Sequence, residues 1–265
     1  MAAISHKPST GITELRQQLK RFLVDDPEVS IVVPAYNEEK TIERLLKSMA
    51  AQVTSYRVEL IIANNNSTDR TQALLDQYGV RSLFVQQQGV AYARQAGLEA
   101  ARGIYIANAD ADSVYPPTWL NTIIKPLENP AVSCTYGTYS FIPSARTSPL
   151  QLALYERASR LASLMRSRTS EPTNVLGFNF AFRRADALAV GGFNLNAGHT
   201  GTVNHKSGPC EDGWMALCLM ERGRLYRVSS PKARARTSDR RLLESGGLGQ
   251  AFTMRLRREW KRLMA

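Results

Sequence analysis

The sequence lacks several features that mark common protein classes. Its 265 residues include three cysteines, Cys134, Cys210 and Cys218, too few and too far apart for a disulfide framework or a zinc cage. No run of eighteen or more apolar residues occurs, so a membrane-spanning helix is not expected. The first ten residues lack the apolar core of a secretion signal. We therefore expect a cytoplasmic protein whose cysteines are buried thiols.

Acidic residues are scarce relative to basic ones. The chain has 34 Lys and Arg against 23 Asp and Glu, a formal net charge of +11 at pH 7. This balance favours anionic partners, but charge alone does not separate nucleic acid, anionic lipid and phosphorylated substrates. The basic residues gather in two stretches, 232–241 and 255–262. No nucleic-acid-binding motif accompanies them, so a nucleic-acid partner is not expected.

The hydrophobic pattern predicts an α/β fold with a Rossmann-like, mostly parallel sheet flanked by helices. After a helical N-terminal extension, residues 1–28, short apolar strands alternate with amphipathic helices. The predicted strands are 29–33, 58–63, 81–85 and 104–110. Such alternation implies right-handed crossovers and an open parallel sheet. Ligands then bind outside the carboxyl ends of the strands.

The second half of the chain is less regular. A strand over 132–142 and a helix from about 150 to 165 with a basic outer face are expected. We predict one domain over 29–228, followed by a basic C-terminal segment, 229–265. Its last helix interleaves apolar and basic residues. It could lie on the inner, anionic face of a membrane or pack its apolar stripe on the domain.

Polar residues follow three of the predicted strands, at 34–38, 64–69 and 110–113, and should converge on one crevice. Asn37 fits the N-cap of the next helix, with Glu38 and Glu39 in its first turn. Asp110 and Asp112 are one residue apart and repel each other unless a cation lies between them. Hard cations prefer carboxylate and phosphate oxygens, so the pair predicts a divalent metal that holds a diphosphate.

Five motifs in order carry a family resemblance that runs from Val29 to Tyr226. They are 32–39 (Val-Val-Pro-Ala-Tyr-Asn-Glu-Glu), 64–69 (Asn-Asn-Asn-Ser-Thr-Asp), Gly89 with Ala93-Arg94, Asp110-Ala111-Asp112, and Gly191-Gly192-Phe193 followed by Glu211-Asp212. With these motifs the chain resembles an inverting glycosyltransferase of family 2, on the nucleotide-diphospho-sugar transferase (GT-A) fold. The resemblance implies a donor half, 29–115, and an acceptor half, 116–228.

The resemblance also assigns roles. Asp112 and Asp110 would bind Mn²⁺ or Mg²⁺, and Asn64 would read the base of the donor, with a UDP-sugar favoured. The residues expected to bind the donor are Pro34, Ala35, Tyr36, Glu38, Asn64, Asn66, Gly89, Arg94, Asp110 and Ala111. Arg240 and Arg241 could close over the diphosphate, because arginines form charge-assisted hydrogen bonds to phosphate.

The Glu211-Asp212 pair opens a predicted helix whose inward face is Trp214, Leu217 and Cys218. Direct displacement needs a carboxylate that takes the proton of the acceptor hydroxyl. Asp212 is the expected general base, and Glu211 would orient the acceptor. The loop histidines His199 and His205 receive no role.

Two alternatives stay open at this point. A sugar-phosphate nucleotidyltransferase is built on a related sheet, but it usually has a glycine-rich basic loop after the first strand, which 34–38 is not. A non-catalytic nucleotide-sugar or membrane-surface binding protein would leave the clustered carboxylates unused, at an electrostatic cost.

Overall fold

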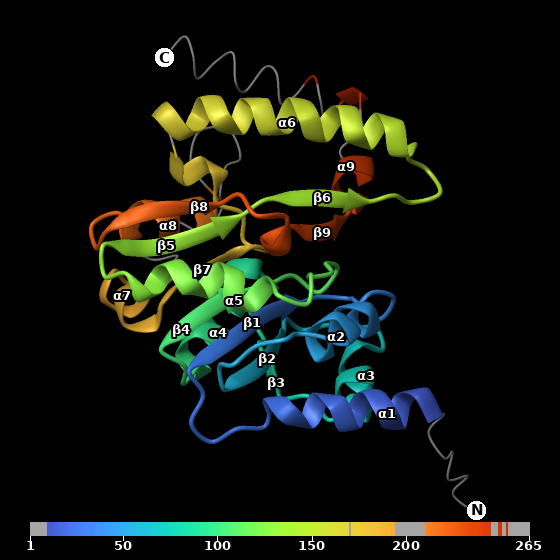
Figure 1. The fold of residues 1–265 in the computed structure, drawn as a ribbon. Coiled ribbons are helices and arrows are strands. Elements are labelled where there is room, and N and C mark those ends of the chain that lie inside the picture. Colours follow the sequence, from blue (N-terminus) through green and yellow to red (C-terminus); the bar gives the residue numbers. More distant parts are fainter. Residues whose placement is uncertain (1–9, 170, 194–209, 245–248, 251–252, 254–265) are drawn as a thin grey trace, which may run out of the picture.

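A computed structural model describes residues 10–169, 171–193, 210–244, 249, 250 and 253 (Figure 1). The chain begins with α1 (Thr10–Leu19) and a 3-10 turn, η1 (Lys20–Phe22). The first half then alternates as predicted: β1 (Val29–Ala35), α2 (Ile42–Ala50), β2 (Val58–Asn64), α3 (Thr71–Tyr78), β3 (Ser82–Phe84), α4 (Val90–Ala100), β4 (Tyr105–Asn108), α5 (Trp119–Ile124) and η2 (Lys125–Glu128). No helix in the described part combines the length and apolarity needed to cross a membrane.

The second half mixes orientations. Its elements are β5 (Val132–Gly137), β6 (Tyr139–Ile142), α6 (Pro149–Thr169), η3 (Glu171–Asn174), β7 (Phe180–Arg183), α7 (Arg184–Ala189), α8 (Glu211–Leu219), β8 (Arg224–Val228), η4 (Pro231–Ala233), β9 (Ala235–Ser238) and α9 (Arg240–Glu244). A seven-stranded sheet has the order β3-β2-β1-β4-β7-β5-β8. Only β7 runs antiparallel to its neighbours in that sheet, so the prediction of a mostly parallel α/β fold is confirmed.

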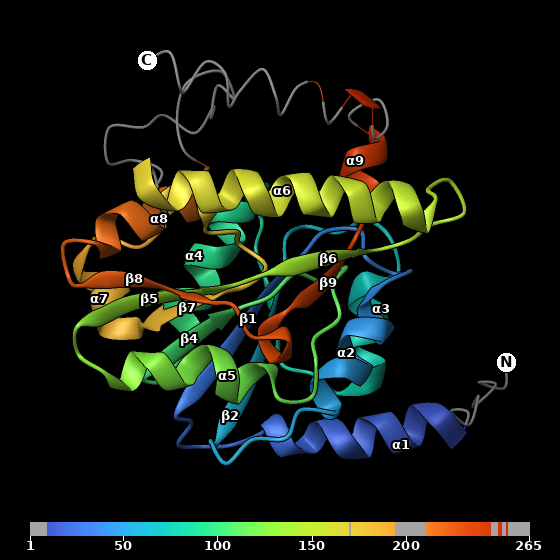
Figure 2. The ribbon, with the colours of Figure 1, turned by 45° about the horizontal axis from the view of Figure 1, so that its top comes forward.

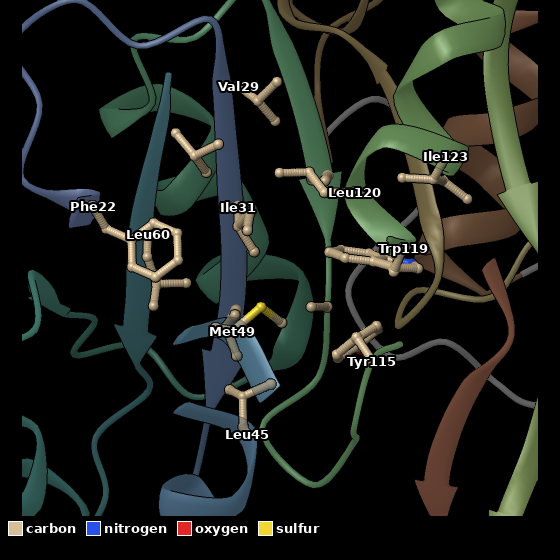
Figure 3. Close-up of a cluster of buried hydrophobic side chains, with 14 of the residues drawn as sticks. Phe22, Val29, Ile31, Leu45, Met49, Leu60, Tyr115, Trp119, Leu120 and Ile123 are labelled. Atoms are coloured by element: carbon tan, nitrogen blue, oxygen red, sulfur yellow. The ribbon is translucent and has the colours of Figure 1, made fainter. Parts of the chain in front are cut away.

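Two hydrophobic clusters cover the two faces of this sheet. On one face, side chains of β1 and β2 pack against α1, α2, α3 and α5, with Trp119 of α5 fully buried (Figure 3). On the other face, Val32 of β1 and the phenylalanines of β7 pack against α4, α7 and α8. The central strands are buried on both sides, which explains why 29–33 is a nearly continuous β-branched run rather than an alternating one.

The prediction of one strand over 132–142 is wrong, because the segment divides at Thr138. β5 stays in the main sheet, whereas β6 leaves it and pairs with β9 in a separate two-stranded sheet beneath α6 (Figures 1 and 2). The Asn179 amide donates to the carbonyls of Thr138 and Ala233, both at 2.8 Å. A Cβ atom at Gly137 would lie 2.4 Å from the Asn179 amide nitrogen. The break therefore depends on a close approach of segments far away in the sequence.

A buried charge cluster holds the amino-terminal end of the sheet. The Glu59 carboxylate of β2 is buried and accepts a hydrogen bond from Ser30 Oγ of β1 at 2.7 Å. It also pairs with Arg81 at 2.5 Å and with Arg102 at 3.3 Å. The carboxylate of Glu59 therefore has partners within the fold, and this cluster stabilises the amino-terminal end of the sheet.

Candidate donor and acceptor site

The carboxyl ends of β1, β2 and β4 open into one cavity of about 260 Å³. Its lining includes most of the residues predicted to bind a donor or metal, together with Asn65, Gln88 and Val90, which were not predicted. The lining residues are Pro34, Ala35, Tyr36, Glu38, Asn65, Gln88, Gly89, Val90, Asp110, Ala111, Asp112 and Arg240. The three polar clusters therefore meet where the open-sheet rule places them.

The first loop is held by the second rather than by its own helix. Asn37 has a positive φ of 54°, and its side-chain oxygen accepts a hydrogen bond from the backbone N–H of Thr68 at 2.8 Å. The predicted N-cap role of Asn37 is wrong: α2 begins at Ile42, its N-cap is Thr41, and its first-turn acid is Glu43. The asparagine ties two loops together instead, because a short amide side chain tolerates the left-handed conformation and still reaches a neighbour.

The second loop has two buried asparagines, of which one lines the cavity and the other does not. Asn64 is 1% exposed, and its amide donates to Gln72 Oε1 at 2.7 Å. Asn65 lines the cavity; its amide donates to the Gln87 carbonyl at 2.7 Å, and its oxygen accepts from the Gly89 N–H at 2.7 Å. Asn64 and Asn66 are not among the lining residues. The polar run before Gly89 was the signal in the sequence that could have placed Gln88 here.

Asp110 and Asp112 follow β4 and are each 7% exposed at the cavity wall. The backbone N–H of Asp110 donates to the Tyr115 hydroxyl at 2.9 Å, and that hydroxyl donates to the Phe178 carbonyl at 2.8 Å. Burial, together with the Asp110 carboxylate, raises the pKa of the Tyr115 hydroxyl well above its ordinary value, so Tyr115 stays a neutral donor. This tyrosine fixes the turn that carries both acids, and nothing local in the sequence marks it.

Arg94 connects an acid that follows β4 to an acid that begins α8. Its side chain is 2% exposed, and its guanidinium pairs with Asp110 at 3.0 Å and with Glu211 at 2.8 Å. Burial lowers the pKa of Arg94, but the carboxylates of Asp110 and Glu211 more than offset that effect and raise it. Arg94 lies behind the cavity wall and is not among the lining residues. It can hold the two acids in place as a fixed positive charge.

The Glu211-Asp212 pair begins α8, and both carboxyl groups are enclosed by neighbouring backbone and side chains. The Asp212 carboxylate accepts hydrogen bonds from the backbone N–H groups of Gly177 and Gly213 and from the Cys210 thiol. Burial raises the pKa of the Glu211 carboxyl; Arg94 opposes this rise and Asp212 adds to it. Gly177 is a position that sequence reasoning missed, because the contact crosses 35 residues.

The predicted inward face of α8 is wrong. The buried side chains are those of Asp212, Met215, Ala216 and Leu219, whereas Leu217 is 43% exposed. The helix begins at Glu211, and the buried set follows the i, i+3, i+4, i+7 spacing from Asp212. His199 and His205 lie outside the described residues.

Arg240, from the C-terminal segment, faces acids of the first loop and of the turn after β4. Its guanidinium pairs with Glu38 at 2.6 Å and lies 3.6 Å from Asp112 Oδ2. Thr237 Oγ1 of the preceding β9 donates to Asp112 Oδ1 at 3.4 Å. The side chain of Arg241 lies outside the described part of the chain. The cavity thus has a cation from residue 240 opposite the acids from β4.

The acids of the cavity fit a hard divalent cation that shares its ligands with a diphosphate. No group of three or more His, Cys, Asp and Glu side chains forms a metal cage in the described residues. An ion here would be held by Asp112 and Asp110, with its other ligands from phosphate oxygens. Asp112 also faces the Arg240 guanidinium, which partly neutralises its charge in this structure.

Comparisons with solved structures support the fold. The chain superimposes on a mannosyltransferase from Pyrobaculum calidifontis in complex with GDP-Man and Mn²⁺, with a TM-score of 0.58 at 19% identity over 93% of this chain and 72% of that one. It also resembles glucosyl-3-phosphoglycerate synthase from Mycobacterium tuberculosis in complex with Mn²⁺ and UDP-Glc, with a TM-score of 0.51 at 20% identity over 88% and 75%. Both share the GT-A architecture expected from the sequence.

Comparisons of sequence give the family. Dodecaprenyl-phosphate galacturonate synthase of Rhizobium johnstonii is 34% identical over 123 residues, 43% of this chain and 36% of that protein. Chondroitin synthase of Pasteurella multocida is 34% identical over 118 residues, 42% of this chain and 12% of that protein. The match covers about a third of the first of these two relatives and about an eighth of the second. The pattern that describes glycosyl transferase family 2 matches residues 30–190, more than half of the chain, and the chain therefore belongs to glycosyl transferase family 2.

Proposed function

We propose that this chain is a metal-dependent glycosyltransferase that moves a hexosyl group from a nucleotide-diphospho-sugar to an acceptor hydroxyl, with inversion at the anomeric carbon. One observation carries the proposal: the cavity acid Asp110 and the acceptor-side acid Glu211 are joined by a single buried arginine, Arg94. Acids about a hundred residues apart in the sequence are thereby linked through one side chain, which supports a shared site.

On the donor side, the loops after β1 and β2 would grip the nucleoside, and Asp112 and Asp110 would hold Mn²⁺ or Mg²⁺ against the diphosphate. A bound ion would neutralise charge on the departing diphosphate. Arg240 would add charge-assisted hydrogen bonds to phosphate oxygens. The structural neighbours carry GDP-Man in one case and UDP-Glc in another, so either base fits this fold. We favour a UDP-sugar.

On the acceptor side, Asp212 would act as the general base. The acceptor oxygen attacks the anomeric carbon from the face opposite the diphosphate, its proton passes to the Asp212 carboxylate, and the bond to the diphosphate oxygen breaks with its electron pair. The backbone N–H groups of Gly177 and Gly213 fix the orientation of this carboxylate. Glu211, held by Arg94, would orient the acceptor.

The test separates binding from chemistry. In Asp212→Asn, donor affinity measured by calorimetry in Mn²⁺ should stay near that of the wild type, because the carboxylate is on the acceptor side. Turnover, measured as release of nucleoside diphosphate, should fall by about 10²–10⁴-fold, the usual effect of losing a positioned base. Asp76→Asn, which removes an exposed acid on α3, is the matched control. Near-normal turnover in Asp212→Asn would show that another group takes the proton.

A further inference from the structure

The helix α6 carries a row of exposed leucines on the outside of the molecule. Leu150, Leu154, Leu161 and Leu164 are 69%, 58%, 63% and 54% exposed. Their spacing of 4, 7 and 3 residues places them on one face of the helix, with Arg157 between them. α6 lies at the opposite end of the molecule from α1, above the β6–β9 sheet (Figures 1 and 2). We call Leu150, Leu154, Arg157, Leu161 and Leu164 the α6 stripe.

The opposite face of α6 is firmly attached, so the outward direction of the stripe is fixed. Leu152 is buried in a small cluster with Phe141 of β6, Tyr155, and Leu242 of α9. The hydroxyls of Ser159 and Tyr139 are 2.7 Å apart, and the Glu156 carboxylate accepts from the backbone N–H of Phe141 at 2.8 Å. The sequence predicted a basic outer face here. The structure shows leucines and arginines together.

The charge of this face is of one sign. Arg146, Arg157 and Arg160 are exposed. Glu156, the single acid between residues 143 and 164, is turned inward with its side chain 14% exposed and is 3.5 Å from Arg160. An apolar row flanked by cations, without an exposed carboxylate, matches the headgroup region of an anionic bilayer. Leucines enter the acyl boundary there and arginines meet phosphates.

We propose that α6 is a membrane-docking helix that lies in the plane of an anionic lipid surface. A second copy fits this face less well, because pairing two stripes would bring arginines together with no exposed acid to neutralise them. Residues 251–265 also match this face poorly in charge, because they carry five basic residues and one acid. α9 packs on α6 through Leu242 and begins with Arg240 at the cavity. Docking would therefore bring the Arg240 side of the site toward the lipid.

The test is co-sedimentation of the full chain with vesicles of phosphatidylcholine, with and without phosphatidylglycerol. The wild type should bind the mixed vesicles. Leu154→Ser/Leu161→Ser should weaken that binding by about tenfold or more, and Arg157→Glu should weaken it only when phosphatidylglycerol is present. The matched control is Leu23→Ser/Leu188→Ser, which changes two exposed leucines on other elements and should bind like the wild type. Far-UV circular dichroism melts confirm that each variant is folded.

The proposal is wrong if the wild type does not bind mixed vesicles, or if Leu154→Ser/Leu161→Ser binds them as well as the wild type does. It is also wrong if light scattering shows that the wild type is a dimer and that the Leu154→Ser/Leu161→Ser variant is a monomer. The variant Leu256→Ser/Trp260→Ser separates the C-terminal segment from α6. If Leu256→Ser/Trp260→Ser still binds the mixed vesicles, the result supports lipid contact through α6. If it loses binding while Leu154→Ser/Leu161→Ser binds normally, lipid contact belongs to the C-terminal residues. The readout does not use turnover, so it is independent of the proposed sugar transfer.

Discussion

Gly177→Ala should destabilise the protein through one side chain, Arg94. A Cβ atom at Gly177 would lie 2.1 Å from both terminal nitrogens of the Arg94 guanidinium. An arginine tip can usually swing away at little cost, but this one is 2% exposed and paired with Asp110 at 3.0 Å and Glu211 at 2.8 Å. The methyl group must therefore displace the guanidinium or the backbone around residue 177.

The magnitude lies between two known costs. Overpacking a core typically costs about 1–3 kcal/mol, and separating a buried ion pair costs about 3–5 kcal/mol. Because a partial shift of Arg94 would weaken its pairs without removing them, we expect a loss of about 2–4 kcal/mol in the free energy of unfolding. For a chain of this size that loss corresponds to a fall in Tm of roughly 5–15 °C.

Urea and thermal unfolding followed by circular dichroism would measure the change. Gly11→Ala is the control, because no atom lies within 4 Å of a Cβ there, and alanine in α1 should be neutral or stabilising by up to about 1 kcal/mol. In an Arg94→Ala background the added cost of Gly177→Ala should fall below about 1 kcal/mol, since the clashing group is gone. An equal cost in both backgrounds would refute the reasoning.

Three further predictions concern charges at the site. Arg240→Gln should weaken binding of nucleoside diphosphate by roughly ten- to a hundredfold, the effect of losing a charged hydrogen bond. The control Arg236→Gln changes an exposed arginine and should leave this binding unchanged. Equal losses in the two variants would show a non-specific effect of charge. Asp112→Ala should abolish the Mn²⁺ dependence of that binding without changing Tm, and unchanged dependence would remove the metal assignment. Because burial raises the pKa of Glu211 above its ordinary 4.5, its contribution to stability is full below that value and is lost as the pH rises through the folded-state pKa. Glu211→Gln should therefore gain stability relative to the wild type across that window, and parallel pH profiles would contradict this.

The strands of the first half could be predicted because their cause is local. A parallel strand covered on both faces must be apolar at nearly every position, and 29–33 and 58–63 are. The position of the acids after β4 could also be predicted, because they directly follow such a strand. In contrast, several partners that hold the acids come from distant segments: Thr237 contacts Asp112, Gly177 contacts Asp212, and Phe178 anchors the Tyr115 hydroxyl that contacts Asp110. Nothing in the residues themselves marks those contacts.

Errors in the predictions also had local causes. Asn37 was predicted to be an N-cap because asparagine is common at that position. Its side-chain oxygen instead accepts a hydrogen bond from the backbone N–H of Thr68 in the neighbouring loop. The face of α8 was placed out of phase because Trp214 and Leu217 are large and apolar, whereas the helix start at Glu211 sets which residues are buried. The division of 132–142 at Thr138 requires Asn179, about 40 residues further along.

The place of β7 in the sheet has a consequence for synthesis of the chain. β4 is paired on one side with β1 and on the other with β7, and β7 follows it by about 70 residues in the sequence. At about 5–20 residues per second, a ribosome needs roughly 4–15 s to make that interval. During this time the nascent sheet carries an open edge at β4, the kind of edge that pairs with other chains. The part of the sheet formed by β1 to β4 is therefore not a module that can be cut out before residue 180. It is closed only by a strand from the half that carries Asp212.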